Sequence, residues 1–150
     1  MRQMDTIEYR HGFSNMRFDD VTSLLSRAYW SVGIGRGEVE KSAANSAYVI
    51  GAFTGEGKQV GYARVVSDKT KFAYLADVIV DEAYRKRGIA SGMVRAILAA
   101  EELKDVYQWL LVTRDAHELY RKLGFSVVGR PLDWMEIRLP RPADRLSVGR

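Results

Sequence analysis

Residues 72–100 limit the possible folds of this chain more than any other stretch. They begin with FAYLADVIV, a run rich in β-branched and aromatic side chains that is typical of a buried strand. The basic turn YRKRG follows, and from Ile89 onward apolar residues recur every three or four positions. That spacing predicts an amphipathic helix that ends near Ala100. A long strand joined by a short turn to a helix predicts a domain in which helices pack against a sheet.

The remaining patterns place hairpins in the first half of the chain and alternating strands and helices in the second. Strands are predicted at 6–13, 48–53, 60–66, 72–80, 107–112, 125–128 and 134–139, and helices after Asp19 and at 39–46, 89–100 and 115–123. We therefore expect the α/β (α+β) class, with a mixed, mostly antiparallel central sheet of about seven strands flanked by helices. The length of 150 residues predicts a single domain at 1–140 and a flexible tail at 141–150.

Composition narrows the classes of function. The chain has no cysteine and two histidines, which argues against a disulfide framework, a thiolate nucleophile and a bound metal. It contains no apolar run of roughly 18 residues and no apolar signal core, so we expect a cytoplasmic protein without a membrane partner. The net charge is +4, but Lys and Arg are scattered apart from the cluster at 85–87. One local cluster favours a small anionic ligand over nucleic acid.

The setting of this cluster predicts a phosphate-binding site. The first amides of a helix have no intrahelical acceptor, and the helix dipole adds about half a positive charge at that end. Gly88 allows the backbone to approach a ligand closely, and Arg85 and Lys86 can add charge-assisted hydrogen bonds to phosphate oxygens. A basic turn by itself is more often a solvated surface feature. The strand before it and the helix after it favour the binding site.

Two stretches resemble the signatures of one enzyme family. DVIVDEAYRKRGIASGMVRAIL resembles the acetyl-coenzyme A signature of the GCN5-related N-acetyltransferase (GNAT) family, in which Arg-x-x-Gly-x-Ala joins a strand to a helix. TRDAHELYRKLGF resembles the family's second motif, and it follows the first at the expected distance. The resemblance implies the GNAT fold over nearly the whole chain, acetyl-coenzyme A as cosubstrate, and transfer of the acetyl group to a primary amine.

The resemblance also implies which residues hold the cofactor. The pyrophosphate would lie on the turn and first amides of the helix, and the pantetheine arm would pair with the main chain at the end of the preceding strand. These cofactor-binding residues are Val78, Ile79, Val80, Arg85, Lys86, Arg87, Gly88, Ile89, Ala90 and Ser91. Thr113 stands where the family usually has Asn, so one expected hydrogen bond to the cofactor depends on a threonine hydroxyl.

Tyr120 and Asp77 are the catalytic candidates. The tyrosine that matches Tyr120 acts in the family as general acid toward the departing thiolate, and the alternative is a buried ring packed on Phe125. Asp77 is a carboxylate inside an apolar strand and is a candidate general base, although a structural hydrogen bond is the alternative. Some members of the family use water as the proton acceptor instead.

The acceptor pocket is predicted from aromatic and polar residues near the first helices and the late strands. The main candidates are Tyr29, Trp30, Arg64 and Trp134, and Ser31, Tyr62, Asp68 and Met135 are further ones. Aromatic rings can stack on a substrate or hold a cationic amine, which favours a small-molecule amine. Two alternatives remain open, namely acetylation of a protein amine and a sensor that binds acyl-coenzyme A without turnover. The family resemblance also implies that two copies of the chain can form a homodimer.

Overall fold

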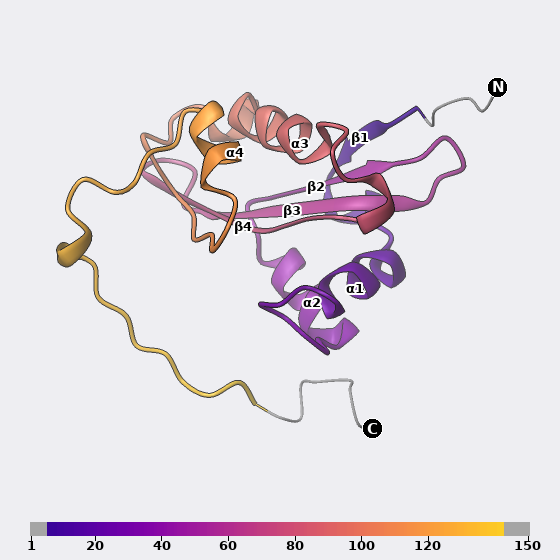
Figure 1. Ribbon diagram of the computed structural model, residues 1–150, viewed down its shortest axis with the longest axis horizontal. Coiled ribbons are helices and arrows are strands. Elements are labelled where there is room, and N and C mark those ends of the chain that lie inside the picture. The colour runs from indigo at the N-terminus through magenta and orange to yellow at the C-terminus, as the bar shows by residue number, and fades with distance from the viewer. Residues whose placement is uncertain (1–5, 143–150) are drawn as a thin grey trace.

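A computed structural model describes residues 6–142 of the chain (Figure 1). The main elements are β1 (Glu8–His11), α1 (Phe18–Ser26), α2 (Arg36–Ala44), β2 (Tyr48–Phe53), β3 (Gln59–Ser67), β4 (Phe72–Val80), α3 (Ile89–Leu98), β5 (Gln108–Leu110) and α4 (His117–Lys122). Short 3-10 helices lie at Phe13–Asn15 (η1), Glu82–Tyr84 (η2), Glu101–Leu103 (η3) and Pro131–Asp133 (η4). Within residues 6–142, no helix is both long enough and apolar enough to cross a bilayer.

The sheet is mixed, as the sequence predicts, and its strands follow the order β1-β2-β3-β4-β5. The first four strands are antiparallel, whereas β5 runs parallel to β4 and pairs only with residues 72–74. Figure 1 shows α1 and α2 on one face of the sheet and α3 and α4 on the other. The predicted class of an α/β sheet flanked by helices is therefore confirmed.

Strand β2 shows why the sheet carries helices on both faces. Its six residues are all buried, which is typical of a central strand covered on both sides. Ile50 and Ala52 belong to the core under α3, while Val49 and Phe53 belong to the core under α1 and α2. Alternation of side chains along one strand thus links the two hydrophobic cores.

The buried side chain of Gln59 ties α1 to the sheet. Its Oε1 accepts a hydrogen bond from the Arg17 amide at 2.8 Å, and its Nε2 donates to the Gly61 carbonyl at 2.9 Å. Asp20, in the first turn of α1, accepts from the Gln59 amide at 3.0 Å. These bonds hold the start of α1 against β3, and the loop that follows α1 carries Tyr29 and Trp30.

The prediction of about seven strands is wrong, because the described residues form a five-stranded sheet. The predicted strands at 125–128 and 134–139 have no ladder partner, and Met135 and Ile137 are 95% and 91% exposed. Strand-forming residues become a strand only where a neighbour accepts their main-chain hydrogen bonds. The first strand is also shorter than predicted, since Gly12 takes a positive φ of 101° and η1 follows.

Candidate active site

A β-bulge near the end of β4 shapes the candidate site. Tyr62 of β3 faces Ile79, but Arg64 faces Ala76, so that Asp77 and Val78 together lie opposite a single residue of β3. Asp77 adopts a left-handed conformation with φ 56°. Because β5 pairs only with the first part of β4, the bulged end of β4 has no neighbour on that side among the described residues.

A cavity of about 630 Å³ lies at this bulged end of β4. Its walls come from four places in the sequence: the loop after α1, the end of β4, the turn into α3, and α4. Most of the predicted site residues line it, namely Tyr29, Trp30, Val78, Ile79, Val80, Arg85, Lys86, Gly88, Ile89, Ala90, Ser91 and Tyr120. The fold therefore brings the two motifs and the predicted acceptor loop to one cleft.

The start of α3 offers free backbone amides to this cleft. Gly88 is the N-cap residue, with a left-handed φ of 77°, and no side chain caps the helix. The Gly92 amide makes the first helical bond, to the Gly88 carbonyl at 2.9 Å, so the amides of the three preceding residues have no acceptor in the helix. A β-carbon added to Gly88 would meet nothing within 4 Å, and the three residues that carry these amides line the cavity.

The basic residues of the turn divide between two roles. Arg85 and Lys86 line the cleft. Arg85 Nε donates to the Val80 carbonyl at 3.2 Å, which braces the turn against the end of β4, and Lys86 takes a left-handed φ of 65°. Arg87 lies outside the lining residues, with its guanidinium 5.0 Å from the centre of the Tyr84 ring. Two of the three predicted cations thus face the cleft.

Tyr120 enters the opposite wall of the cleft from α4. Its ring is 9% exposed and packs edge-on against Phe125 at 5.8 Å, so the predicted packing contact is present beside the cleft position. Burial, and next the nearby Tyr29, raise the pKa of Tyr120 to about 12. The phenol therefore keeps its proton at neutral pH and can act as a hydrogen-bond or proton donor.

The carboxylate of Asp77 is held between two elements and lies outside the residues that line the cleft. Its Oδ2 accepts from Arg64 Nε at 2.7 Å, and its Oδ1 accepts from Trp30 Nε1 at 3.0 Å. The side chains of Arg64 and Asp77 are only 19% and 15% exposed. This arrangement matches the structural hydrogen bond that the sequence offers as the alternative to catalysis by Asp77. Arg64, the partner of Asp77, also lies outside the residues that line the cleft.

Thr113 and Trp134 also lie outside the cleft lining. The Thr113 hydroxyl accepts a hydrogen bond from the Ala116 amide at 3.0 Å, just before α4 begins. Trp134 lines a separate cavity beside β5. Of the further acceptor candidates, Asp68 caps the β3–β4 turn by accepting from three backbone amides, and Met135 is 95% exposed.

Arg114 is a cleft neighbour that no pattern in the sequence marks. It lies in the loop before α4, and its guanidinium stacks over the Tyr29 ring at 4.1 Å. Tyr29 in turn meets Trp30 edge-on, with ring centres 5.0 Å apart. The contact joins the loop after α1 to the loop before α4. Arg114 occupies a position of the second motif at which any residue is permitted, so the sequence gives no specific signal for this contact.

Comparison with known proteins assigns the fold. A profile described as acetyltransferase (GNAT) domain matches residues 45–127. The structure of a GNAT-family protein from Xanthomonas campestris superposes with a TM-score of 0.84 at 32% identity, covering 92% of this chain and 96% of that one. A GNAT-family acetyltransferase from Streptococcus pneumoniae gives a TM-score of 0.68 at 25% identity, covering 93% and 99%.

A third structure shares the fold alone. A predicted acetyltransferase from Clostridium acetobutylicum, solved with acetyl-coenzyme A, gives a TM-score of 0.63 at 18% identity, covering 89% of this chain and 96% of that one. No curated protein sequence matches this chain significantly. The profile match over more than half of the chain, together with the 32% identity to the Xanthomonas protein, shows that this chain belongs to the GNAT acetyltransferase family.

Proposed function

We propose that this protein transfers an acetyl group from acetyl-coenzyme A to a primary amine of a small molecule, with both substrates held in one cleft. The observation that carries the proposal is the cavity that joins the free amides of α3 to the ring of Tyr120. One end of the cleft offers a site for a phosphate group, and the other offers a protonated phenol.

The residues at the start of α3 fit a diphosphate. Free amides at a helix N-terminus, open space before Gly88, and the cations Arg85 and Lys86 are the groups that bind phosphate oxygens. Val78 and Ile79 have no strand neighbour on one side of β4 among the described residues, so their main chain can bond to the amide groups of an extended pantetheine arm. When bound, acetyl-coenzyme A supplies the acetyl thioester. The similar fold solved with acetyl-coenzyme A supports this choice of cosubstrate.

Tyr120 is proposed as the general acid. Its Oη keeps its proton because burial raises the pKa to about 12, and it can give that proton to a departing thiolate. The main-chain amide of Val78 is proposed to donate to the thioester oxygen, where a preorganised donor can lower a barrier by several kcal/mol. Both carboxylate oxygens of Asp77 accept hydrogen bonds, so we assign Asp77 to holding Trp30 in place. Water is then proposed as the proton acceptor for the attacking amine.

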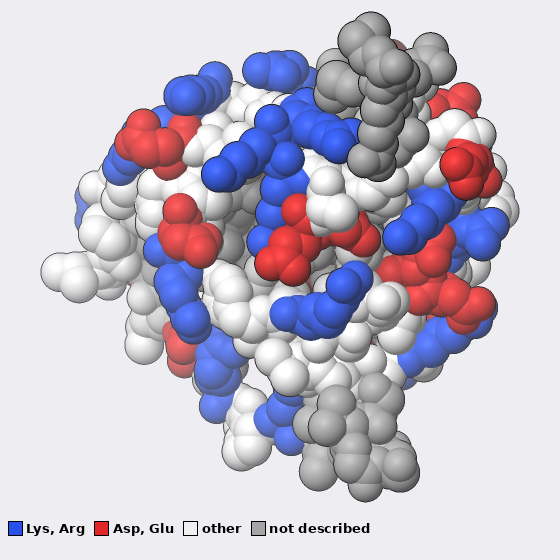
Figure 2. Space-filling model, turned by 45° about the vertical axis from the view of Figure 1, so that its right-hand side comes forward, with Lys and Arg blue, Asp and Glu red and all other residues white. Residues whose placement is uncertain are grey.

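The acceptor is proposed to enter between the loop after α1 and α4. Tyr29 and Trp30 line this part of the cleft, and aromatic side chains suit a small organic amine. Figure 2 shows basic and acidic side chains interleaved over one face of the molecule, without a continuous basic band across that face. This distribution supports a small ligand better than a nucleic acid partner.

The test is a screen of primary amines with acetyl-coenzyme A, in which released thiol is measured. Tyr120→Phe is expected to lower kcat by about 10²-fold, because it removes the proton donor, while the Kd for acetyl-coenzyme A stays within about twofold. Tyr107→Phe removes a hydroxyl from an exposed ring and serves as the control. Binding of acetyl-coenzyme A without thiol release for any amine would instead indicate a sensor. An unchanged kcat in Tyr120→Phe would show that Tyr120 contributes only by packing and not as a proton donor.

A further inference from the structure

Most arginines in residues 6–142 have a carboxylate as their partner. Ion pairs hold Arg10, Arg17, Arg36, Arg64, Arg121, Arg130, Arg138 and Arg141. The arginines of this part of the chain that make no ion pair are Arg27, Arg85, Arg87, Arg95 and Arg114. All of these except Arg95 line the cleft or adjoin a residue that lines it. The unpaired guanidinium groups are therefore gathered around one site.

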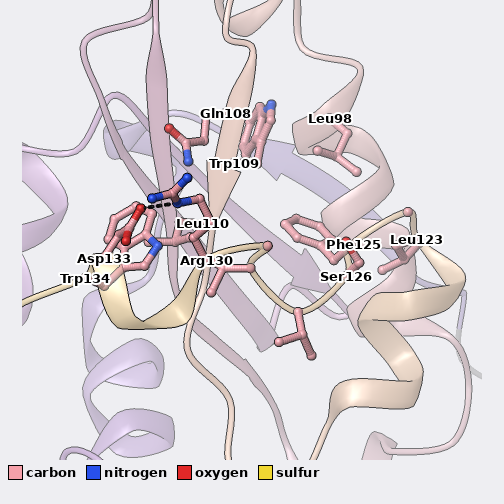
Figure 3. A pocket seen from close by; sticks show the side chains of 14 residues that line it. Leu98, Gln108, Trp109, Leu110, Leu123, Phe125, Ser126, Arg130, Asp133 and Trp134 are labelled. Carbon is pink, nitrogen blue, oxygen red and sulfur yellow. Dashed lines mark hydrogen bonds and ion pairs between the residues drawn. The ribbon is translucent and has the colours of Figure 1, made fainter.

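The larger cavity beside β5 has a different arrangement of charge. It measures about 750 Å³, and its charged lining residues are Arg130 and Asp133. Figure 3 shows these two side chains joined by an ion pair, so the guanidinium there already has a carboxylate partner. That cavity offers no excess charge to a ligand, and the comparison directs attention to the cleft.

The wall of the cleft carries more positive than negative charge. Among the described residues that line it, the cations are Arg27, Arg85 and Lys86, and the carboxylate is that of Asp115. None of these four side chains makes an ion pair within the described chain. The diphosphate of the proposed cofactor balances Arg85 and Lys86, because both lie in the turn before the free amides of α3. Positive charge then remains at the end of the cleft formed by the loop after α1.

Arg114 adds a guanidinium to that end of the cleft. It lies 4.1 Å from the centre of the Tyr29 ring, and Tyr29 lines the cleft. No hydrogen bond or ion pair joins the Arg114 side chain to another described residue. A guanidinium stacked on a ring keeps its N–H groups in its own plane, where a planar carboxylate can accept two of them. The contact with Tyr29 thus positions Arg114 as an anion ligand at the rim of the proposed acceptor site.

Arg27 contributes charge between the two ends of the cleft. It is the C-cap residue of α1, and its Nε donates to the Ser23 carbonyl at 3.1 Å. It lines the cleft, and together with Arg85 it also borders a smaller cavity of about 190 Å³ at the end of β4. Arg27 therefore adds to the positive potential of the whole cleft, whereas Arg114 is the cation specific to the acceptor end.

We propose that the acceptor is a small amine that also carries a carboxylate, as an amino acid does, and that Arg114 binds this carboxylate. The inference rests on the proposed acetyl transfer and specifies its substrate class. An amine with no anionic group is mostly an ammonium ion at neutral pH and would enter a positively charged cleft against repulsion. A carboxylate on the same molecule removes this penalty, and Tyr29 and Trp30 offer aromatic surface to the rest of the molecule.

Calorimetry on the protein saturated with coenzyme A tests this recognition without turnover. The ligands are matched pairs that differ by the carboxylate, namely phenylalanine and phenethylamine, tryptophan and tryptamine, and aminohexanoate and hexylamine. In at least one pair, the amine with the carboxylate is expected to bind at least about 10-fold more tightly, which is the effect of one hydrogen-bonded charge pair. Equal binding, tighter binding of the plain amine, or no binding in every pair would overturn the proposal.

Variants of Arg114 then assign the preference to one side chain. Arg114→Gln is expected to reduce the preference to less than about twofold and to leave the Kd for acetyl-coenzyme A unchanged, whereas Arg114→Lys keeps the charge without the planar fork and should retain part of the preference. Arg95→Gln is the matched control, because Arg95 also makes no ion pair but lies on α3 outside the cleft lining. A full preference in Arg114→Gln, or a loss of equal size in Arg95→Gln, would overturn the role of Arg114.

Thiol release from acetyl-coenzyme A separates this inference from the proposed function. Equal release with both members of every pair would leave acetyl transfer standing and overturn the carboxylate site. Tighter binding of the carboxylate-bearing amines, lost in Arg114→Gln but without thiol release for any amine, would support the carboxylate site and contradict acetyl transfer.

Discussion

Replacing Arg64 by Met removes the guanidinium that faces Asp77 and keeps an apolar stem of similar length. The Arg64 Nε to Asp77 Oδ2 distance is 2.7 Å, and both side chains are more than four-fifths buried. In Arg64→Met the carboxylate keeps one side-chain donor, Trp30 Nε1. The complementary change is Asp77→Asn, because Asn can still accept from Trp30 and tolerates the left-handed φ of 56° at this position.

The cost of breaking this pair follows from its burial. Removal of one partner of a fully buried ion pair costs about 3–5 kcal/mol, whereas an exposed pair contributes about 0–1 kcal/mol. For a pair that is mostly but not fully buried, we expect each single variant to lose about 2–3 kcal/mol of unfolding free energy. The double variant is expected to lose about 2 kcal/mol less than the sum of the two, since neither remaining group is then left as an unpaired charge.

The assay is urea denaturation of the wild type, both single variants and the double variant, followed by steady-state kinetics. A coupling energy below about 0.5 kcal/mol would refute the role of this ion pair in holding Asp77 against Trp30. Steady-state kinetics then distinguish this positioning role from a role of Asp77 as general base. A positioning role predicts that Arg64→Met and Asp77→Asn both raise the KM for the amine and leave the KM for acetyl-coenzyme A unchanged. A general base at Asp77 predicts a kcat loss above about 100-fold in Asp77→Asn alone.

Three further changes test other parts of the structure. Gly88→Glu is expected to weaken acetyl-coenzyme A binding more than about 100-fold in calorimetry, because it strains a left-handed position and places an anion before the free amides, whereas Gly55→Glu, also in open space, should bind normally. Gln59→Leu leaves buried main-chain groups of two elements unpaired and should cost about 2–3 kcal/mol of unfolding free energy, and a loss below 0.5 kcal/mol would contradict the role of Gln59 in anchoring α1. Backbone amides, first that of Lys71, lower the pKa of Asp68 to about 2, so its stabilising effect is present above pH 4 and is lost as the pH falls toward 2. Asp68→Asn should therefore have a lower Tm than the wild type at pH 6 but nearly the same Tm at pH 2, and an equal difference at both pH values would disprove this linkage.

The local patterns of the chain determine the end of the cleft that is proposed to bind the cofactor. The β4 run, the turn with Gly88 and the amphipathic α3 are correctly predicted, because a strand, a left-handed turn and a helix N-terminus each depend on residues near one another in sequence. The same holds for α4 and Tyr120, which the second motif predicts. These parts need no knowledge of which distant segments meet.

Distant contacts decide the rest of the site and the edge of the sheet. The bond from Trp30 to Asp77 and the stacking of Arg114 on Tyr29 join segments that are far apart in sequence, so no local pattern predicts them. The bond from Arg64 to Asp77 depends on the bulge that shifts the register between β3 and β4. Residues 134–139 have the correct alternation for a strand, yet they form none because no neighbour within the described chain pairs with them. The alternation of apolar and polar residues predicts which face of a segment is buried, whereas only the packed structure determines what covers that face.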